Sequence, residues 1–224
     1  MVIMHRGHRQ SGFTLIEILV SMALASLLLY MVVGTSFSSR RNLDETVNNI
    51  ERIIRFSSDE ASLQNKFIRL GFPLEELDQR PTLEIAQSND FVIDIEGTRN
   101  FDDLTEEEQE EMKSSGRFTP LPEFNADDFT PSGAVKIVAV GSTLTQKLHT
   151  TGKPFVYFYP TGEKDSVIII LATEEEMVAL STEPYSQVIN REYVALEGVN
   201  FGNEDYVEKL IEKANELYDE WLSN

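Results

Sequence analysis

The sequence predicts an α+β fold: a long N-terminal helix that begins in a membrane and packs on an antiparallel β-sheet or sandwich, with an added C-terminal amphipathic helix. Three observations predict it. An apolar run occupies residues 13–37, short alternating segments follow residue 63, and helical spacing returns at the end of the chain. Short strands without intervening helices favour antiparallel pairing over a doubly wound fold.

The composition narrows the possible functions. The chain has 224 residues, enough for one soluble domain or two small ones, and 41% of them are hydrophobic, which suffices for a core. It carries 38 acidic and 19 basic residues, a net charge of −19, and such a surface repels the phosphates of nucleic acids. The absence of cysteine excludes disulfides, thiolate metal sites and a cysteine nucleophile.

The apolar run is long enough to cross a membrane. Residues 13–37 contain one charged side chain, Glu17, and as a helix they span about 37 Å, more than the roughly 30 Å of a hydrocarbon core. A short basic leader, residues 1–12, precedes them. The alternative is a secretory signal peptide cut after Ala23-Leu24-Ala25. It is disfavoured because an acid in the apolar region costs about 2–3 kcal/mol of insertion, and because the run continues past that cut.

Glu17 needs an explanation, because an acid in lipid is costly unless something compensates it. If the chain is cut between Gly12 and Phe13, the new amino terminus lies one helical turn from Glu17 and on the same face. The two groups can pair within one chain. Between chains, the acid of one helix can neutralise the amine of its neighbour and set the register of a helical assembly.

These residues carry a resemblance to a known family. The segment Gly12-Phe13-Thr14-Leu15-Ile16-Glu17, with its basic leader and long apolar helix, closely resembles the class III signal of type IV pilins and type II secretion pseudopilins. The resemblance implies that a prepilin peptidase cleaves between Gly12 and Phe13 and N-methylates Phe13. It also implies that Glu17 is the assembly residue, which meets the amino terminus of a neighbouring subunit.

Orientation rests on the resemblance and not on charge, because Arg6 and Arg9 before the run are matched by Arg40 and Arg41 after it. The resemblance implies a single-pass protein of the bacterial inner membrane, with its soluble domain in the periplasm.

The helical pattern continues over residues 38–62. Four apolar residues follow spacings of four, three and four: Leu43, Val47, Ile50 and Ile54. This spacing predicts one long helix that ends against a soluble domain near residues 57–61. A separate surface helix after a hinge at residues 34–39 is the alternative.

Residues 63–202 have the pattern of a β-rich domain. Ile68, Leu70 and Phe72 alternate with Arg69 and Gly71, which is the period of a strand. Further strands, most of them bounded by Pro, Gly, Asn or Asp, are predicted at Thr82–Ala86, Phe91–Ile95, Val135–Val140, Lys153–Tyr159, Ser166–Leu171 and Tyr193–Leu196.

Two segments resemble the minor pseudopilin H family. Residues 58–72 look like its helix-to-strand junction, in which an EA-x-LQ turn leads into a strand. Residues 158–163 are similar to its F-x-P-x-G hairpin, where Pro160 and Gly162 suit a tight turn between two strands. Such turns occur in many β domains, so both segments indicate a fold and not a site.

The chain departs from that family in two places. Seven of the ten residues 102–111 are acidic, so residues 99–131 are predicted to form a long, acidic, mobile insertion. Residues 203–224 have the apolar spacing of a strongly amphipathic helix. We predict that this helix packs on the domain. Binding in a partner's groove is the alternative, and the burial of Trp221 distinguishes the two.

Other chemistry receives little support from the sequence. His5 and His8 lie in the leader and His149 stands alone, so neither a histidine metal site nor a catalytic triad is predicted. No glycine-rich nucleotide motif occurs. The acidic residues of 94–103 lack the spacing of a calcium loop, and a solvated loop is the preferred interpretation. We predict a protein that is not an enzyme and has no catalytic residue, metal or cofactor.

The predicted function is therefore structural. The protein resembles a minor pseudopilin of the H type, a subunit of the short periplasmic pseudopilus that pushes secreted proteins toward an outer-membrane channel. The expected partners are the major and the other minor pseudopilins, prepilin peptidase, the inner membrane and, as a further candidate, secreted cargo. The alternatives are a minor pilin of a type IV pilus and a membrane-tethered periplasmic binding protein.

Overall fold

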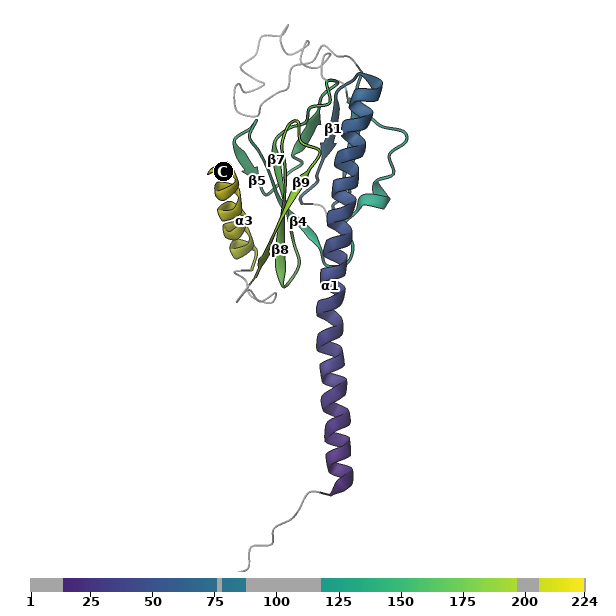
Figure 1. Cartoon of the computed structure of the whole chain (residues 1–224), viewed down its shortest axis with the longest axis vertical. Coiled ribbons are helices and arrows are strands. Elements are labelled where there is room, and N and C mark those ends of the chain that lie inside the picture. Colours follow the sequence, from purple (N-terminus) through teal and green to yellow (C-terminus); the bar gives the residue numbers. More distant parts are fainter. Residues whose placement is uncertain (1–13, 76–77, 88–117, 197–205, 224) are drawn as a thin grey trace, which may run out of the picture. The chain divides into compact units, whose positions relative to one another are not determined.

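The computed structural model describes residues 14–75, 78–87, 118–196 and 206–223, with the backbone alone for residues 29–37. The chain divides into two units, residues 1–38 and residues 39–224. The described elements (Figure 1) are α1 (Leu15–Gln64), β1 (Ile68–Gly71), β2 (Thr82–Ala86), β3 (Phe118–Pro120), the 3-10 helix η2 (Ala126–Phe129), β4 (Lys136–Ser142), β5 (Lys147–His149), β6 (Phe155–Phe158), β7 (Val167–Ala172), β8 (Glu176–Thr182), β9 (Ile189–Ala195) and α3 (Tyr206–Ser223).

The strands form two antiparallel sheets, which confirms the predicted α+β class. One sheet has the order β3-β2-β1-β6 and the other the order β5-β4-β7-β8-β9. In the four-stranded sheet, Arg69 of β1 pairs with Glu84 of β2 on one side and with Tyr157 of β6 on the other. In the five-stranded sheet, the register between β4 and β7 shifts between Ile137 and Ala139, as at a β-bulge.

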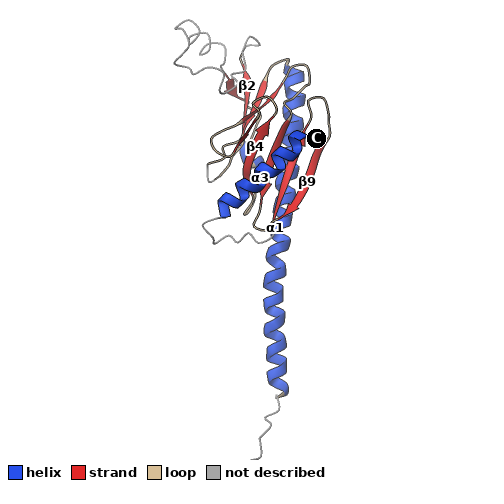
Figure 2. Ribbon diagram, turned by 90° about the vertical axis from the view of Figure 1, so that its left-hand side faces the viewer, coloured by secondary structure: helices blue, strands red, loops and turns tan. Residues whose placement is uncertain are grey.

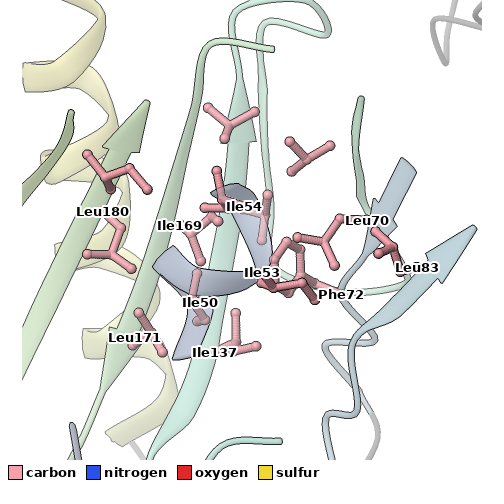
Figure 3. Packing of buried hydrophobic residues seen from close by; sticks show 14 of the residues in the cluster. Ile50, Ile53, Ile54, Leu70, Phe72, Leu83, Ile137, Ile169, Leu171 and Leu180 are labelled. Atoms are coloured by element: carbon pink, nitrogen blue, oxygen red, sulfur yellow. The ribbon is translucent and has the colours of Figure 1, made fainter. Parts of the chain in front are cut away.

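The main core lies between the two sheets and the part of α1 that follows residue 39. The four residues that predicted this amphipathic stretch, Leu43, Val47, Ile50 and Ile54, are all buried. Figure 3 shows Ile50, Ile53 and Ile54 of α1 between Ile169 and Leu171 of one sheet and Leu70 and Leu83 of the other. Burying side chains of this size stabilises the fold by roughly 1.5–3 kcal/mol each. This stretch belongs to α1, which extends from Leu15 to Gln64.

Helix α1 ends in a Schellman motif, a few residues beyond the predicted end at residues 57–61. Asn65 adopts a left-handed backbone conformation, with φ of 52°. The amide of Lys66 donates to the carbonyl of Ala61 over 3.1 Å, and the amide of Asn65 donates to the carbonyl of Ser62 over 3.4 Å. Asn tolerates the left-handed region better than most residues, so Asn65 stops the helix and turns the chain into β1.

The connection from β6 to β7 corrects one prediction. It contains the tight turn expected around Pro160 and Gly162, because the amide of Tyr159 donates to the carbonyl of Glu163 over 2.9 Å and Gly162 has a φ of 89°. The strands on either side, however, belong to different sheets. Antiparallel pairing across the turn consists of a single bridge between Phe158 and Lys164, and the predicted hairpin between β6 and β7 does not form. Turn residues specify a reversal of the chain, but they do not specify which strands pair.

Asp165 joins the two sheets just after this turn. Its carboxylate accepts hydrogen bonds of 2.9 Å from the backbone amide of Tyr157 in β6 and from the hydroxyl of Tyr159. Its carbonyl accepts a bond of 2.9 Å from the hydroxyl of Thr182 in β8. Burial raises the pKa of the Asp165 carboxyl, and the bonds from Tyr157 and Tyr159 offset part of that effect.

Helix α3 packs on the other face of the five-stranded sheet, as predicted in preference to binding in a partner's groove (Figure 2). Its buried side chains are Leu210, Ala214, Leu217 and Tyr218. Gly141 of β4 makes room for this layer, since a Cβ there would lie 2.5 Å from Cε2 of Tyr218. Trp221 is half-buried against Tyr218, with ring centroids 5.9 Å apart.

The remaining strand predictions have mixed outcomes. Strand β2 has the predicted bounds, and β1, β4, β6, β7 and β9 overlap predicted segments, whereas β3, β5 and β8 were not anticipated. The segment 91–95 and residues 99–117 of the expected insertion lie outside the described residues. The rest of the expected insertion contains β3, which pairs with β2, and η2. Residues 118–131 therefore include part of the folded domain.

Candidate functional site

The start of α1 is capped by Thr14. Its carbonyl accepts hydrogen bonds from the amides of Glu17, over 3.0 Å, and of Ile18, over 3.3 Å. Its hydroxyl oxygen also accepts a hydrogen bond of 3.4 Å from the amide of Glu17, three residues along the chain, as the side chain of an N-cap threonine does. The apolar run predicted a helix start near Phe13 and no role for Thr14, although this spacing is a signal that could have identified it.

The cap defines the position of Glu17. Because Thr14 precedes the first helical residue, Glu17 lies in the first turn of α1, where the positive end of the helix dipole favours a carboxylate. The side chain of Glu17 is exposed. Gly12 and Phe13, the predicted processing residues, lie outside the described residues. The structure thus supplies the place of Glu17 on the helix, and its pairing with a Phe13 amine stays a prediction.

Residues 15–28 of α1 present apolar side chains all around the helix. Among the large ones, the exposed fraction ranges from 50% for Ile18 to 78% for Leu15. The hydroxyls of Ser21 and Ser26 do not interrupt this surface, because they donate to the helix's own carbonyls of Glu17, over 2.7 Å, and Ala23, over 2.9 Å. Glu17 is the one charged residue of this stretch. Such a surface is stable only when lipid or other apolar helices cover it.

The side chains of residues 29–37 lie outside the described set. Within the part of the chain that is described, no helix has a stretch that is both long and apolar enough to cross a membrane.

The end of α1 and the turn after β6 contact one another in the domain. The hydroxyl of Ser58, on the last turns of α1, lies 3.5 Å from the carbonyl of Gly162 in the turn after β6. A Cβ on Gly162 would lie 3.4 Å from the hydroxyl of Ser62. Phe67 and Tyr159 pack edge to face, with centroids 5.6 Å apart. The end of the helix and the turn thus form one packed unit.

A seam of polar contacts connects α1 to β8 and β9. Arg191 of β9 donates to Glu51 over 2.6 Å and to Asn48 over 3.0 Å. Arg40 pairs with Glu176 and lies over the ring of Tyr193, 4.3 Å from its centroid. Burial raises the pKa of Glu176, although Arg40 acts in the opposite direction. These contacts hold the second half of α1 against the sheet.

The described part of the domain contains no candidate metal site. No group of three or more His, Asp or Glu side chains there is placed to hold a metal ion.

Comparison with known proteins identifies the N-terminal segment. Residues 7–33 match the family described as Prokaryotic N-terminal methylation motif. The chain carries a type IV pilin-like signal. This pilin-like signal contains Gly12, Phe13 and Glu17, and it supports a pilin or pseudopilin with a membrane-anchored N-terminus. No curated protein and no solved structure is similar enough to match the chain.

Proposed function

We propose that this protein is a minor pseudopilin of the H type in a type II secretion pseudopilus. In this proposal a prepilin peptidase cleaves between Gly12 and Phe13 and methylates Phe13. The helix then anchors the chain once in the bacterial inner membrane, with the domain in the periplasm. The subunit has no enzymatic activity of its own and helps to drive protein export across the outer membrane. Its partners are the major pseudopilin, the other minor pseudopilins and, as a further candidate, secreted cargo.

The observation that carries the proposal is the pilin-like signal at the start of a helix whose apolar side chains are exposed on every side. An all-apolar helix leaves lipid readily only by packing into a bundle of similar helices. Glu17, the single acid of the stretch, then needs a positive partner, and a freed amine of a neighbouring subunit supplies one. The charge pair therefore favours one axial register between subunits.

The H type is supported by the domain. Residues 58–72 and 158–163, whose sequences resemble the H family, pack together around Ser58 and Gly162. Helix α1 continues into a domain of two antiparallel sheets. The same signal and helix also suit a minor pilin of a type IV pilus. Loss of the gene separates the two possibilities, because a pseudopilin mutant loses protein export and a pilin mutant loses surface pili.

Mass spectrometry of the protein isolated from its native membrane tests the processing step. We expect a mature chain that begins at N-methylated Phe13, because the signal places Phe13 directly after Gly12. Unprocessed protein that starts at Met1, or protein that starts at Ser26, contradicts the proposal. The second of these results indicates a secretory signal peptide instead.

Replacement of Glu17 by Gln tests the assembly step while preserving the size of the side chain. We expect the variant to be processed and to stay in the membrane. Its incorporation into the pseudopilus, and export, should fall by about tenfold or more, since the neighbouring amine loses its charge partner. The matched control is Asp59→Asn, which removes an exposed acid from the other half of α1 and is expected to have no effect. Equal incorporation of wild type and Glu17→Gln favours a tethered binding protein.

A further inference from the structure

A cleft lies where the β4–β5 hairpin meets the outer face of the four-stranded sheet. It has a volume of about 450 Å³, within the range of small-molecule sites. Its walls come from distant parts of the chain: Arg69 of β1, Phe155 and Tyr157 of β6, Ser142 of β4, His149 of β5, and Lys153 before β6. The pilin-like signal and the assembly helix contribute nothing to it.

The charge of this cleft is opposite to that of the chain. The protein has twice as many acidic as basic residues, 38 against 19. Of the described residues that line the cleft, none is Asp or Glu, while Arg69, Lys153 and His149 all line it. A local reversal of charge in an acidic protein concentrates anions at that point of its surface.

Arg69 is held in a fixed orientation. Its guanidinium lies between the rings of Phe118 and Phe155, 4.1 Å from each centroid. Its Nε donates to Glu84 over 2.8 Å, and a second nitrogen lies 2.6 Å from the same carboxylate oxygen. A guanidinium fixed in this way loses little side-chain entropy when it donates to a ligand.

The cations are more accessible than the carboxylate that balances them. The side chain of Glu84 is 15% exposed, whereas those of Arg69 and Lys153 are 24% and 37% exposed. Lys153 lies 3.4 Å from Glu84 and extends across Gly71, where a Cβ would lie only 2.7 Å from its Cε. One recessed carboxylate thus balances two cations, and the positive charges face the cleft.

The remaining walls supply apolar surface and hydroxyl groups. Phe155, Pro154 and Val140 line the cleft, and so does Thr145, whose buried Oγ1 has no hydrogen-bond partner among the described residues. The cleft is larger than an inorganic ion requires. Cations beside aromatic and aliphatic walls are suited to an anionic group attached to an apolar body.

We propose that this cleft binds an organic carboxylate, with the carboxylate at Arg69 and Lys153 and its apolar body against Phe155. The ligand chemistry has two sources, a free organic acid or the C-terminal carboxylate of a polypeptide. The site is independent of the assembly helix, so the proposal does not depend on the pseudopilin function.

The test is a titration of the full-length protein in a non-ionic detergent, followed by the amide resonances of His149, Lys153 and Tyr157. One probe is 3-phenylpropionate, compared with its neutral amide, 3-phenylpropionamide. The second is acetyl-Gly-Phe with a free carboxylate, compared with its amide. We expect each acid to bind more tightly than its amide by about two- to fivefold, the range of an exposed ion pair, and more weakly in 0.5 M salt.

Lys153→Met tests the cation while preserving the length of the side chain, and Lys209→Met on the exposed face of α3 is the matched control. We expect the Kd for the acids to rise about two- to fivefold in Lys153→Met and to stay unchanged in Lys209→Met. Tighter binding of the peptide acid than of 3-phenylpropionate identifies a polypeptide terminus as the source, and equal binding identifies a free acid. Equal binding of acid and amide, or an unchanged Kd in Lys153→Met, overturns the proposal.

Discussion

Two stretches of α1 carry similar apolar side chains in opposite surroundings. Leu19, in the first stretch, is 59% exposed, and Ile53, in the second, is fully buried. The second stretch meets strands of both sheets, so its partners are within the chain. The first stretch, residues 15–28, has exposed apolar side chains, and its partners are expected to be lipid and neighbouring helices.

The polar side chains of α1 follow the same division. In the first stretch the hydroxyls of Ser21 and Ser26 bond to the helix's own carbonyls, so they add no specificity toward the domain. In the second stretch Asn48 and Glu51 bond to Arg191 of β9. One helix thus combines a surface for an external environment with a surface built for one particular domain. Substitutions in the two stretches should therefore have separable effects.

The largest expected effect on stability comes from truncation in the second stretch. Ile53→Ala should lower the free energy of unfolding by about 3 kcal/mol, because it removes buried methyl groups and leaves a cavity. Urea unfolding of the full-length protein in mild detergent, followed by the fluorescence of the single tryptophan, Trp221, measures it. The matched control is Leu19→Ala, which should change the value by less than about 0.5 kcal/mol. A comparable loss in both variants would show that the two stretches do not differ as described.

The next largest effect is expected at Asp165, which joins the two sheets on which the second stretch packs. Asp165→Ala should cost about 2 kcal/mol, because the amide of Tyr157 and the hydroxyl of Tyr159 lose their acceptor. Asp165→Asn keeps an acceptor for one of them and should cost less. The same urea unfolding experiment measures both, with the exposed Asp59→Asn as the control.

The pH dependence of these variants has a defined sign. Burial raises the pKa of Asp165 above its ordinary value of 3.8, so the folded state holds a proton that the unfolded state releases. The contribution of this group to stability is therefore greatest below pH 3.8 and is lost as the pH rises through the folded pKa. Asp165→Asn lacks this titration. Its stability relative to the wild type should rise with pH over that interval, and a constant difference would contradict the assignment.

Periodicity allowed much of this fold to be predicted. The spacing of Leu43, Val47, Ile50 and Ile54 is sufficient to identify the buried face of α1, because a helix repeats its faces every three to four residues. Strand β8 was missed because it is buried on both faces and so lacks alternation, and because acidic residues precede it. Strands β3 and β5 have three residues each, too few to show a period.

The candidate sites also differ in whether a local sequence pattern reveals them. Glu17 is a candidate from the sequence alone because it is an acid in an apolar run, which is a local anomaly. The Thr14 cap has a local signature as well, because Thr14 lies three residues before the acid that its hydroxyl approaches. The cleft at Arg69 and Lys153 has no sequence signature, because the pairing of β1 with β6 brings together residues that are far apart in the chain. Long-range pairing of strands is set by tertiary packing, and a single sequence does not encode it as a pattern.

The smallest effect concerns the polar seam that orients the second stretch. Arg191→Met should lower the free energy of unfolding by about 0.5–1 kcal/mol, since Arg191 is partly exposed but its partner Glu51 is mostly buried. Arg55→Met is the matched control, because Arg55 approaches the same Glu51 over 3.9 Å and is more exposed. The control should have less than half the effect of Arg191→Met. Salt at 1 M should reduce the difference between the two variants. If the two are equivalent, the seam acts only through the total charge around Glu51, and the core alone determines how α1 packs on β9.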